Sequence, residues 1–232
     1  MRYTDERFIG GLVDGLKELG LYERALIVFT SDHGEEFYEH KGWGHGHSLY
    51  DESLKVPLII KFPGGEYRGR RVESIVSLVD VFPTILDFLN LSDPQGLRDG
   101  RSLLPLIEGK EQGDRTFVAD VASDVLHSRI PQKTAMNDGR LKLILNAPFP
   151  PEARDYFLAP PPLVDAVEVF DIEKDPGETT NIRDTTPNIS RRIIRAIEKM
   201  YREAEKRNIQ KLKMGEELKK QLKALGYIGR IS

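Results

Sequence analysis

The sequence predicts an α/β protein in which a mixed sheet flanked by helices is followed by a small antiparallel sheet and a C-terminal helix. Two continuous apolar runs, ALIVFT at 25–30 and VPLII at 56–60, are typical of strands buried in a sheet core. Apolar residues at helical spacing precede the first run and follow the second. From about residue 115 the chain changes to short strand candidates separated by turn residues, which indicates a second, smaller sheet.

The first half of the chain opens on an amphipathic helix over about 5–19, and Gly20 then acts as a stop signal. The run at 25–30 suits a strand that is covered on both faces, as in a parallel sheet. The second run ends at a Pro-Gly-Gly turn. Residues 74–91 have the spacing of a short strand or turn that leads into a helix.

The second half contains four segments with strand character. Turn signals separate them, among them Asn137-Asp138-Gly139 and the proline-rich stretch 148–162. Because neighbouring strands joined by short turns pair in opposite directions, we expect a small antiparallel sheet. The segments are TFVADV, KTAMND, RLKLIL and AVEVFDI.

The C-terminal segment, from about residue 188, carries a predicted helix with one apolar face and a basic composition. Residues 191–223 hold twelve Lys and Arg against five Asp and Glu, a charge of +7, which we interpret as a solvated helix face. The predicted division is 1–114 for the α/β part, 115–186 for the small sheet and 187–232 for the tail. The apolar face of the tail helix is Ile193, Ile194, Ile197, Met200 and Tyr201.

Composition excludes several kinds of chemistry. The 232 residues include no cysteine, so disulfides, thiolate metal sites and a cysteine nucleophile are ruled out for this chain. No apolar run is long enough to cross a bilayer, and no signal peptide begins at Met1, so we expect a cytoplasmic protein without a membrane span. Nothing in the composition indicates binding to nucleic acid.

Histidines are concentrated in one short stretch directly after the first predicted strand. Four of the five lie between residues 30 and 65, among many carboxylates. Asp32 and His33 leave the strand at its carboxyl end, where open α/β sheets place their ligands, and offer an oxygen and a nitrogen to a cation. Gly34 then lets the backbone turn away. The pair therefore predicts a divalent metal site, with Ca, Mg, Zn and Mn all compatible with such donors.

Two ligands do not complete a site, and the sequence leaves the others open. His45 or His47 could return to the metal across a glycine-rich loop. Glu35 and Glu36 could hydrogen-bond His33 or simply be solvated. The alternative for the whole cluster is a turn whose histidines are hydrogen-bonded and bind no cation. We expect His40, in a charged segment beside a lysine, to lie on the surface.

Several motifs, in this order along the chain, resemble the sulfatase family of the alkaline-phosphatase superfamily. The resemblance implies an alkaline-phosphatase-like fold, a metal-dependent hydrolase of sulfate or phosphate esters, and metal ligation by Asp32 and His33. It covers almost the whole chain. The motifs are IVFTSDHGEEFYEH, GHGHSLYDESLKVPLIIKFPGG, VSLVDVFPTILDFLNL, GRSLLPLIEGK, EVFDIEKDPGETTNI and LKALGYI.

Two departures from the family pattern matter for function. Many sulfatases have a lysine shortly before the Tyr-Asp pair, whereas this chain has His45 and His47 there. Either could act as a catalytic cation on the transferred group or bind a second metal, and we favour His47 slightly. The family's C/S-x-P-S-R nucleophile motif does not occur in this sequence. The chain therefore resembles the C-terminal half of such an enzyme.

That resemblance predicts little or no turnover by this chain alone, because the covalent nucleophile is missing from it. We expect a complementing N-terminal-half polypeptide or a homo-oligomer, since strands patterned for burial need neighbours. The alternative is a non-catalytic metal- or anion-binding interaction module derived from a sulfatase-like enzyme. Lys142 lies where relatives often carry a basic residue, and we expect it to support the core rather than touch substrate.

Overall fold

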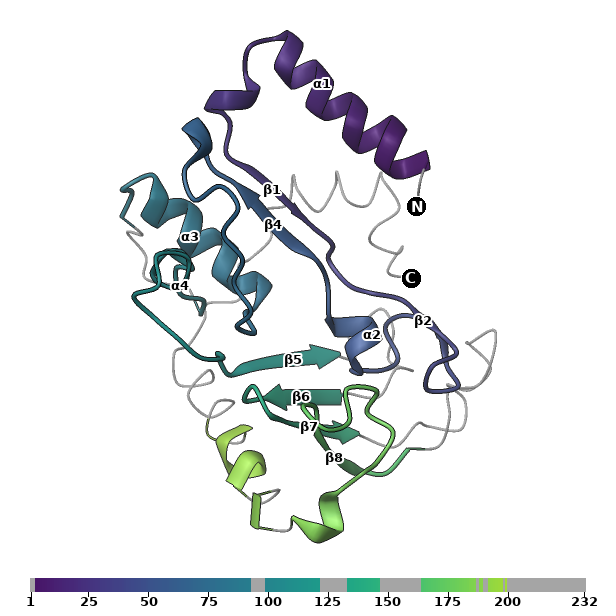
Figure 1. The fold of residues 1–232 in the computed structure, drawn as a ribbon. Coiled ribbons are helices and arrows are strands. Elements are labelled where there is room, and N and C mark those ends of the chain that lie inside the picture. Colours follow the sequence, from purple (N-terminus) through teal and green to yellow (C-terminus); the bar gives the residue numbers. More distant parts are fainter. Residues whose placement is uncertain are drawn as a thin grey trace, which may run out of the picture. The chain divides into compact units, whose positions relative to one another are not determined.

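A computed structural model describes residues 3–92, 99–121, 133–146, 164–186, 188–189, 192–197 and 199 of the chain (Figure 1). The fold divides into two compact units. The first comprises Met1–His33 and Lys55–Arg115, and the second Gly34–Leu54 and Thr116–Ser232. Among the described residues, no helix has both the length and the apolar character that crossing a bilayer requires.

The first unit opens with the predicted helix. A π-helical turn over Thr4–Ile9 continues into α1 (Gly10–Glu18), and Gly20 ends the element in the left-handed region with φ +66°. The apolar stripe of this helix contains no buried residue, and Phe8 is 73% exposed. The helix prediction is confirmed, but its apolar face is open in this unit.

Strands β1 (Ile27–Thr30) and β4 (Leu58–Lys61) coincide with the two apolar runs. They pair antiparallel, so the expected parallel neighbour of the first run is not found among the described residues. Burial is also partial, with Phe29 38% and Ile59 60% exposed. The physical reason is that each strand has one described partner, which leaves its other edge and part of its faces uncovered.

Short helices follow β4 in the described part of the first unit. Two 3₁₀ turns, Pro63–Gly65 and Leu78–Asp80, come before α3 (Val81–Phe88), and the short α4 (Leu104–Ile107) comes after it. Ser77 caps the turn Leu78–Asp80 through a reciprocal capping box with Asp80. This cap explains why the predicted turn leads directly into α3.

Arg115, at the end of the first unit, is almost fully buried and joins three segments. Its guanidinium lies 3.1 Å from an oxygen of Asp80 and 2.8 Å from an oxygen of Glu111. It also donates hydrogen bonds of 2.8 Å to the carbonyls of Arg101 and Ser102. Burial disfavours the charged guanidinium, but the paired carboxylates outweigh it and raise the pKa of Arg115. This pairing stabilises the chain just before the second unit.

The second unit is built on a four-stranded sheet in the order β5-β6-β7-β8, with every neighbouring pair antiparallel. The predicted small antiparallel sheet is therefore confirmed. The turn after the second of these strands begins at Asn137, whose side chain accepts a hydrogen bond from Gly139, and that glycine has φ +100°. The strands are β5 (Phe117–Val121), β6 (Lys133–Asn137), β7 (Leu141–Asn146) and β8 (Val167–Asp171).

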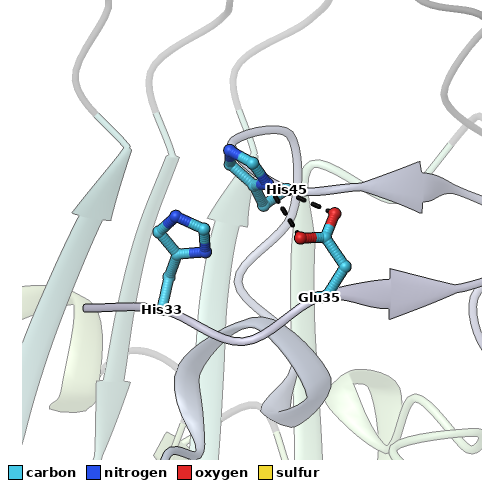
Figure 2. Close-up of side chains that lie close together, drawn as sticks. All are labelled: His33, Glu35 and His45. Carbon is cyan, nitrogen blue, oxygen red and sulfur yellow. Dashed lines mark hydrogen bonds and ion pairs between the residues drawn. The ribbon is translucent and has the colours of Figure 1, made fainter. Parts of the chain in front are cut away.

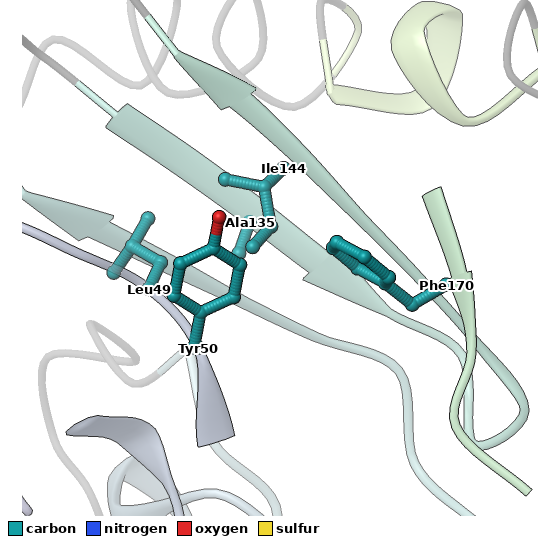
Figure 3. Packing of buried hydrophobic residues seen from close by; sticks show 5 residues of the cluster. All are labelled: Leu49, Tyr50, Ala135, Ile144 and Phe170. Carbon is teal, nitrogen blue, oxygen red and sulfur yellow. The ribbon is translucent and has the colours of Figure 1, made fainter. Parts of the chain in front are cut away.

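Two hydrophobic clusters pack against this sheet. In one, Leu49 and Tyr50 from the first half of the sequence meet Ala135, Ile144 and Phe170 of the sheet (Figure 3). The loop that follows β1 is thereby anchored to strands about a hundred residues later in the chain. The other cluster joins sheet residues to the described part of the tail helix: Leu141, Leu143, Val169, Ile193 and Ile197.

Parts of the sequence-based prediction fall outside the described residues. They include Met200, Tyr201 and the proline-rich stretch 148–162. Ile193 and Ile197, on the predicted apolar face of the tail, are 5% and 2% exposed, which confirms that face where it is described. The predicted three-part division stays a prediction.

Candidate metal-binding loop

The loop after β1 folds into a small hairpin. Strands β2 (Glu36–Phe37) and β3 (Trp43–Gly44) pair antiparallel, and α2 (Asp51–Leu54) follows. Phe37 and Trp43 face each other across the hairpin with their rings edge to face at 5.8 Å. Because Glu36 pairs with Gly44, the residues just outside the hairpin, 35 and 45, come together.

Glu35 and His45 are in contact at the open end of this hairpin. His45 Nδ1 lies 3.1 and 3.2 Å from the two carboxylate oxygens of Glu35. His33, two residues before Glu35 in the same segment, stands beside them (Figure 2). The three residues each offer one ligand atom, and these atoms lie within 4.8 Å of one another. Their side chains are about half exposed, at 42% for His33, 40% for Glu35 and 53% for His45.

This donor set fits a divalent cation. Two imidazole nitrogens and one carboxylate oxygen are ligands that zinc and manganese accept, and their separation allows a common centre. The group is the one set of three or more close metal-type donors among the described residues. The sequence alone leaves Glu35 as either a partner of His33 or a solvated residue, because its place beside His45 depends on the pairing of β2 with β3.

Asp32 lies next to this group. Its carboxylate accepts a 3.0 Å hydrogen bond from the backbone N–H of His33, and its second oxygen is 3.7 Å from His33 Nε2. That backbone hydrogen bond and the neighbouring imidazole lower the pKa of Asp32. The side chain is 85% exposed, so an ionised oxygen is open to solvent beside His33. The two predicted ligands thus lie together.

His47, in contrast, lies in the interior. It is 3% exposed, and its Nε2 is 2.8 Å from a carboxylate oxygen of Glu36. The same carboxylate accepts hydrogen bonds from the backbone N–H groups of His40 and Gly42 and from Ser48. A Cβ at Gly42 would come within 2.4 Å of His47 Nε2, so glycine is required there. The two histidines therefore have different surroundings. His45 belongs to the exposed donor group, whereas His47 is buried in a pair with Glu36.

His40 is not the surface residue that the sequence suggested. Its side chain is 15% exposed, with Nδ1 2.6 Å from Glu52 and Nε2 3.1 Å from the carbonyl oxygen of Glu178. The ring stacks on Tyr50 at 3.7 Å. Burial alone would lower the pKa of His40, but the hydrogen bond to Glu52 and the other nearby acceptors outweigh it and raise that pKa to about 9. The expectation was wrong because the partners come from distant segments.

A raised pKa makes His40 a source of pH-dependent stability. Its contribution is complete below about pH 6.5, declines as pH rises, and is lost above about pH 9. Allowing for partial solvent contact, we expect a loss of about 1–2 kcal/mol over this interval. Urea unfolding at pH 6 and pH 9.5 measures it, with His40→Gln as the reference. If both proteins lose the same stability, the ion pair of His40 is not the cause.

Lys142 lies in the core of the second unit, as the sequence suggested. Its side chain is fully buried, with Nζ 2.8 Å from Asp51 and 2.7 Å from Glu178. The lysine comes from β7, while its partners come from α2 and from the turn after β8. This ion pair therefore connects the loop to the sheet, and it offers no exposed cation to a substrate.

Gly34 is required by close approach rather than by its φ angle. A Cβ at this position would come 1.9 Å from the carbonyl oxygen of Glu52. We therefore expect Gly34→Ala to cost about 1–3 kcal/mol in unfolding free energy, because backbone must shift. Gly11→Ala in α1 is the matched control, since nothing lies within 4 Å of its Cβ and alanine favours helix. Equal thermal stability of the two variants would contradict the close approach.

Comparisons with a family profile and with curated proteins point to the same family. The sequence profile described as Sulfatase matches residues 1–91. Arylsulfatase K of Rattus norvegicus is 32% identical over 190 residues, covering 80% of this chain and 31% of the relative. The multifunctional alkaline phosphatase superfamily protein PehA of Trinickia caryophylli is 36% identical over 183 residues, covering 75% of this chain and 33% of the relative.

Solved structures agree in fold. The phosphonate monoester hydrolase of Agrobacterium radiobacter superposes with a TM-score of 0.61 at 29% identity, over 84% of this chain and 38% of that one. BT1596, a 2-O GAG sulfatase, superposes with a TM-score of 0.66 at 22% identity, over 88% and 42%. The chain spans about a third of the length of arylsulfatase K and of PehA. It belongs to the sulfatase family of the alkaline-phosphatase-like superfamily.

Proposed function

We propose that this chain provides the metal-binding part of an active site that hydrolyses sulfate or phosphate esters. The observation that carries the proposal is the exposed donor group of His33, Glu35 and His45, beside the ionised Asp32. Family membership supports the reaction class, because it is a family of hydrolases. Exposure of the donors supports access by a substrate, since a purely structural metal site is normally closed.

His33, Glu35 and His45 would hold the cation, with Asp32 as a fourth ligand. When bound, a divalent ion neutralises negative charge on an ester and polarises its oxygen. The chain's own residues have other tasks. Glu35 and His45 lie side by side, with His45 Nδ1 3.1 Å from the carboxylate, so both would face the same cation, and the backbone N–H of His33 donates to the Asp32 carboxylate and favours its ionised form. Glu36 and His47 fix the hairpin that presents these side chains.

The family's nucleophile would come from another polypeptide, because the sequence contains neither cysteine nor the family's C/S-x-P-S-R motif. We propose a partner polypeptide carrying the family's N-terminal half. Within the described part of the chain, β1 and β4 each have one unpaired edge and Phe29 and Ile59 are exposed, which supports such a partner. A homo-oligomer that covers the same surface is the alternative, and size-exclusion chromatography with light scattering separates the two.

The relatives define which classes of ester are candidate substrates. Phosphate and phosphonate esters belong among the candidates because similar proteins include a phosphonate monoester hydrolase. Sulfate esters belong there because others are arylsulfatases.

The test combines this chain with the polypeptide encoded directly upstream of Met1. Hydrolysis is measured for each chain alone and for the mixture, with manganese or zinc added. The substrates are an aryl sulfate, an aryl phosphate and an aryl phosphonate monoester. We expect turnover only in the mixture, and a loss of at least about 1000-fold when Asp32→Ala replaces the wild type. A mixture no faster than the separate chains would contradict the proposed catalytic function.

A non-catalytic metal-binding module is the second candidate. It is favoured by one specific observation, that the chain holds three close metal-type donors while the family's nucleophile motif does not occur in its sequence. Calorimetric binding of manganese or zinc by this chain, together with no turnover in the mixture, would support it. Turnover in the mixture would exclude it.

A further inference from the structure

Glu178 combines three features that are individually uncommon. It is 2% exposed, it carries a carboxylate, and its backbone lies in the left-handed region with φ +50°. A non-glycine residue in this region costs about 1 kcal/mol and persists where its surroundings determine its conformation. Glu178 lies in the DPGETTN motif after β8. The Asp-Pro-Gly of this motif is typical of a tight turn.

The contacts of Glu178 show what determines that conformation. One carboxylate oxygen accepts a 2.6 Å hydrogen bond from the backbone N–H of Asp51, and the other lies 2.7 Å from Lys142 Nζ. The backbone carbonyl oxygen lies 3.1 Å from His40 Nε2. One residue therefore binds the hairpin loop, the start of α2 and a sheet strand together.

These contacts enclose the part of the loop that carries a candidate ligand. Glu178 holds residue 40 through its carbonyl and residue 51 through its carboxylate, and His45 lies between them. The ends of this segment are also joined to each other, since His40 lies 2.6 Å from Glu52 and stacks on Tyr50. Fixing both ends limits the positions that His45 can take relative to Glu35.

Electrostatics reinforce this arrangement. Burial raises the pKa of Glu178, and the nearby Lys142 opposes that rise by favouring the carboxylate. Lys142 faces two acids, Asp51 and Glu178, so the loss of one carboxylate changes the charge balance of the whole cluster. The charges of Glu178 and Glu52 also favour protonated His40.

We propose that Glu178 is a positioning residue for metal binding. Through His40 and Asp51 it holds the 40–51 segment so that His45 meets Glu35, although Glu178 itself touches no candidate ligand in the described contacts. The inference rests on the proposed function, since it assumes that His33, Glu35 and His45 bind a divalent cation. It predicts that a substitution 133 residues away from His45 weakens cation binding by about 10–100-fold.

Cobalt(II) titration followed by visible absorption tests the inference, because the d–d bands report both affinity and ligand geometry. Glu178→Gln preserves size and removes the charge, and Glu173→Gln is the matched control on the same turn, where the side chain is exposed. We expect Glu178→Gln to bind Co²⁺ about 10–100-fold more weakly with altered bands, and Glu173→Gln to match wild type. Circular dichroism at the titration temperature establishes that each variant is folded.

His40→Gln provides an independent arm, because it removes the contact to the Glu178 carbonyl, the pair with Glu52 and the stacking on Tyr50 while leaving the Glu178 carboxylate in place. If Glu178→Gln does not fold, the Co²⁺ affinity and bands of His40→Gln test the positioning role instead. Weaker binding with altered bands in a folded variant supports positioning, whereas wild-type affinity and bands in every folded variant overturn it and leave the proposed metal site intact. A wild-type chain that binds no Co²⁺ overturns the proposed metal site and, with it, this inference.

Discussion

Lys142→Met is expected to destabilise the second unit by about 3–5 kcal/mol. The lysine is fully buried between Asp51 and Glu178, and the latter is itself 1% exposed on its side chain. Removing the cation leaves two carboxylates facing each other without compensation, and burial has already made the charged form of Glu178 unfavourable. Because a domain is typically stable by about 5–15 kcal/mol, this loss is a large fraction of its stability.

Chemical unfolding of wild type and Lys142→Met measures the effect, with Lys174→Met as the matched control. Lys174 is 76% exposed and lies 3.9 Å from its nearest acid, so its loss should cost less than about 0.5 kcal/mol. Adding Glu178→Gln to Lys142→Met should recover part of the stability by removing one unpaired charge. A midpoint for Lys142→Met within error of wild type would show that the buried pair does not stabilise the fold.

His45→Ala is expected to weaken divalent-metal binding by about 100-fold or more, which is about 2.7 kcal/mol. The reason is that it removes one of three donor atoms that lie within 4.8 Å of one another. Because His45 is 53% exposed, the substitution should change unfolding free energy by less than about 0.5 kcal/mol. Isothermal titration with Mn²⁺ or Zn²⁺ measures the affinity.

His47→Ala is the informative contrast. His47 is buried against Glu36, so its loss should lower stability while removing none of the three donor residues themselves. The exposed Lys41→Ala serves as the neutral control in the same loop. If His47→Ala removes metal binding and His45→Ala does not, the assignment of the two histidines must be exchanged.

Periodicity in the sequence was sufficient to predict most of the fold. The helix before β1, both strands of the first unit and all four strands of the small sheet occur where apolar spacing and turn residues indicated them. These features are local, because each depends on residues a few positions apart. Strand direction and burial in the first unit were not predictable in the same way, since they depend on which neighbours cover a strand.

The candidate site was predictable only in part, for the same reason. Asp32 and His33 are adjacent in sequence, so their proximity in the structure was foreseeable. The choice between His45 and His47 depended on how the chain folds after β3, which leaves His45 exposed beside Glu35 and buries His47 against Glu36. Lys142 and Glu178 meet the loop across 91 and 127 residues of sequence, and no local pattern encodes such pairings.

Anomalous X-ray diffraction from crystals of this chain grown with Mn²⁺ or Zn²⁺ would locate a bound cation. We expect a peak within about 2.0–2.3 Å of ligand atoms from His33, Glu35 and His45, with Asp32 beside it. A well-diffracting crystal with saturating metal and no peak at these residues, or with a peak coordinated elsewhere, would show that these residues do not form the metal site.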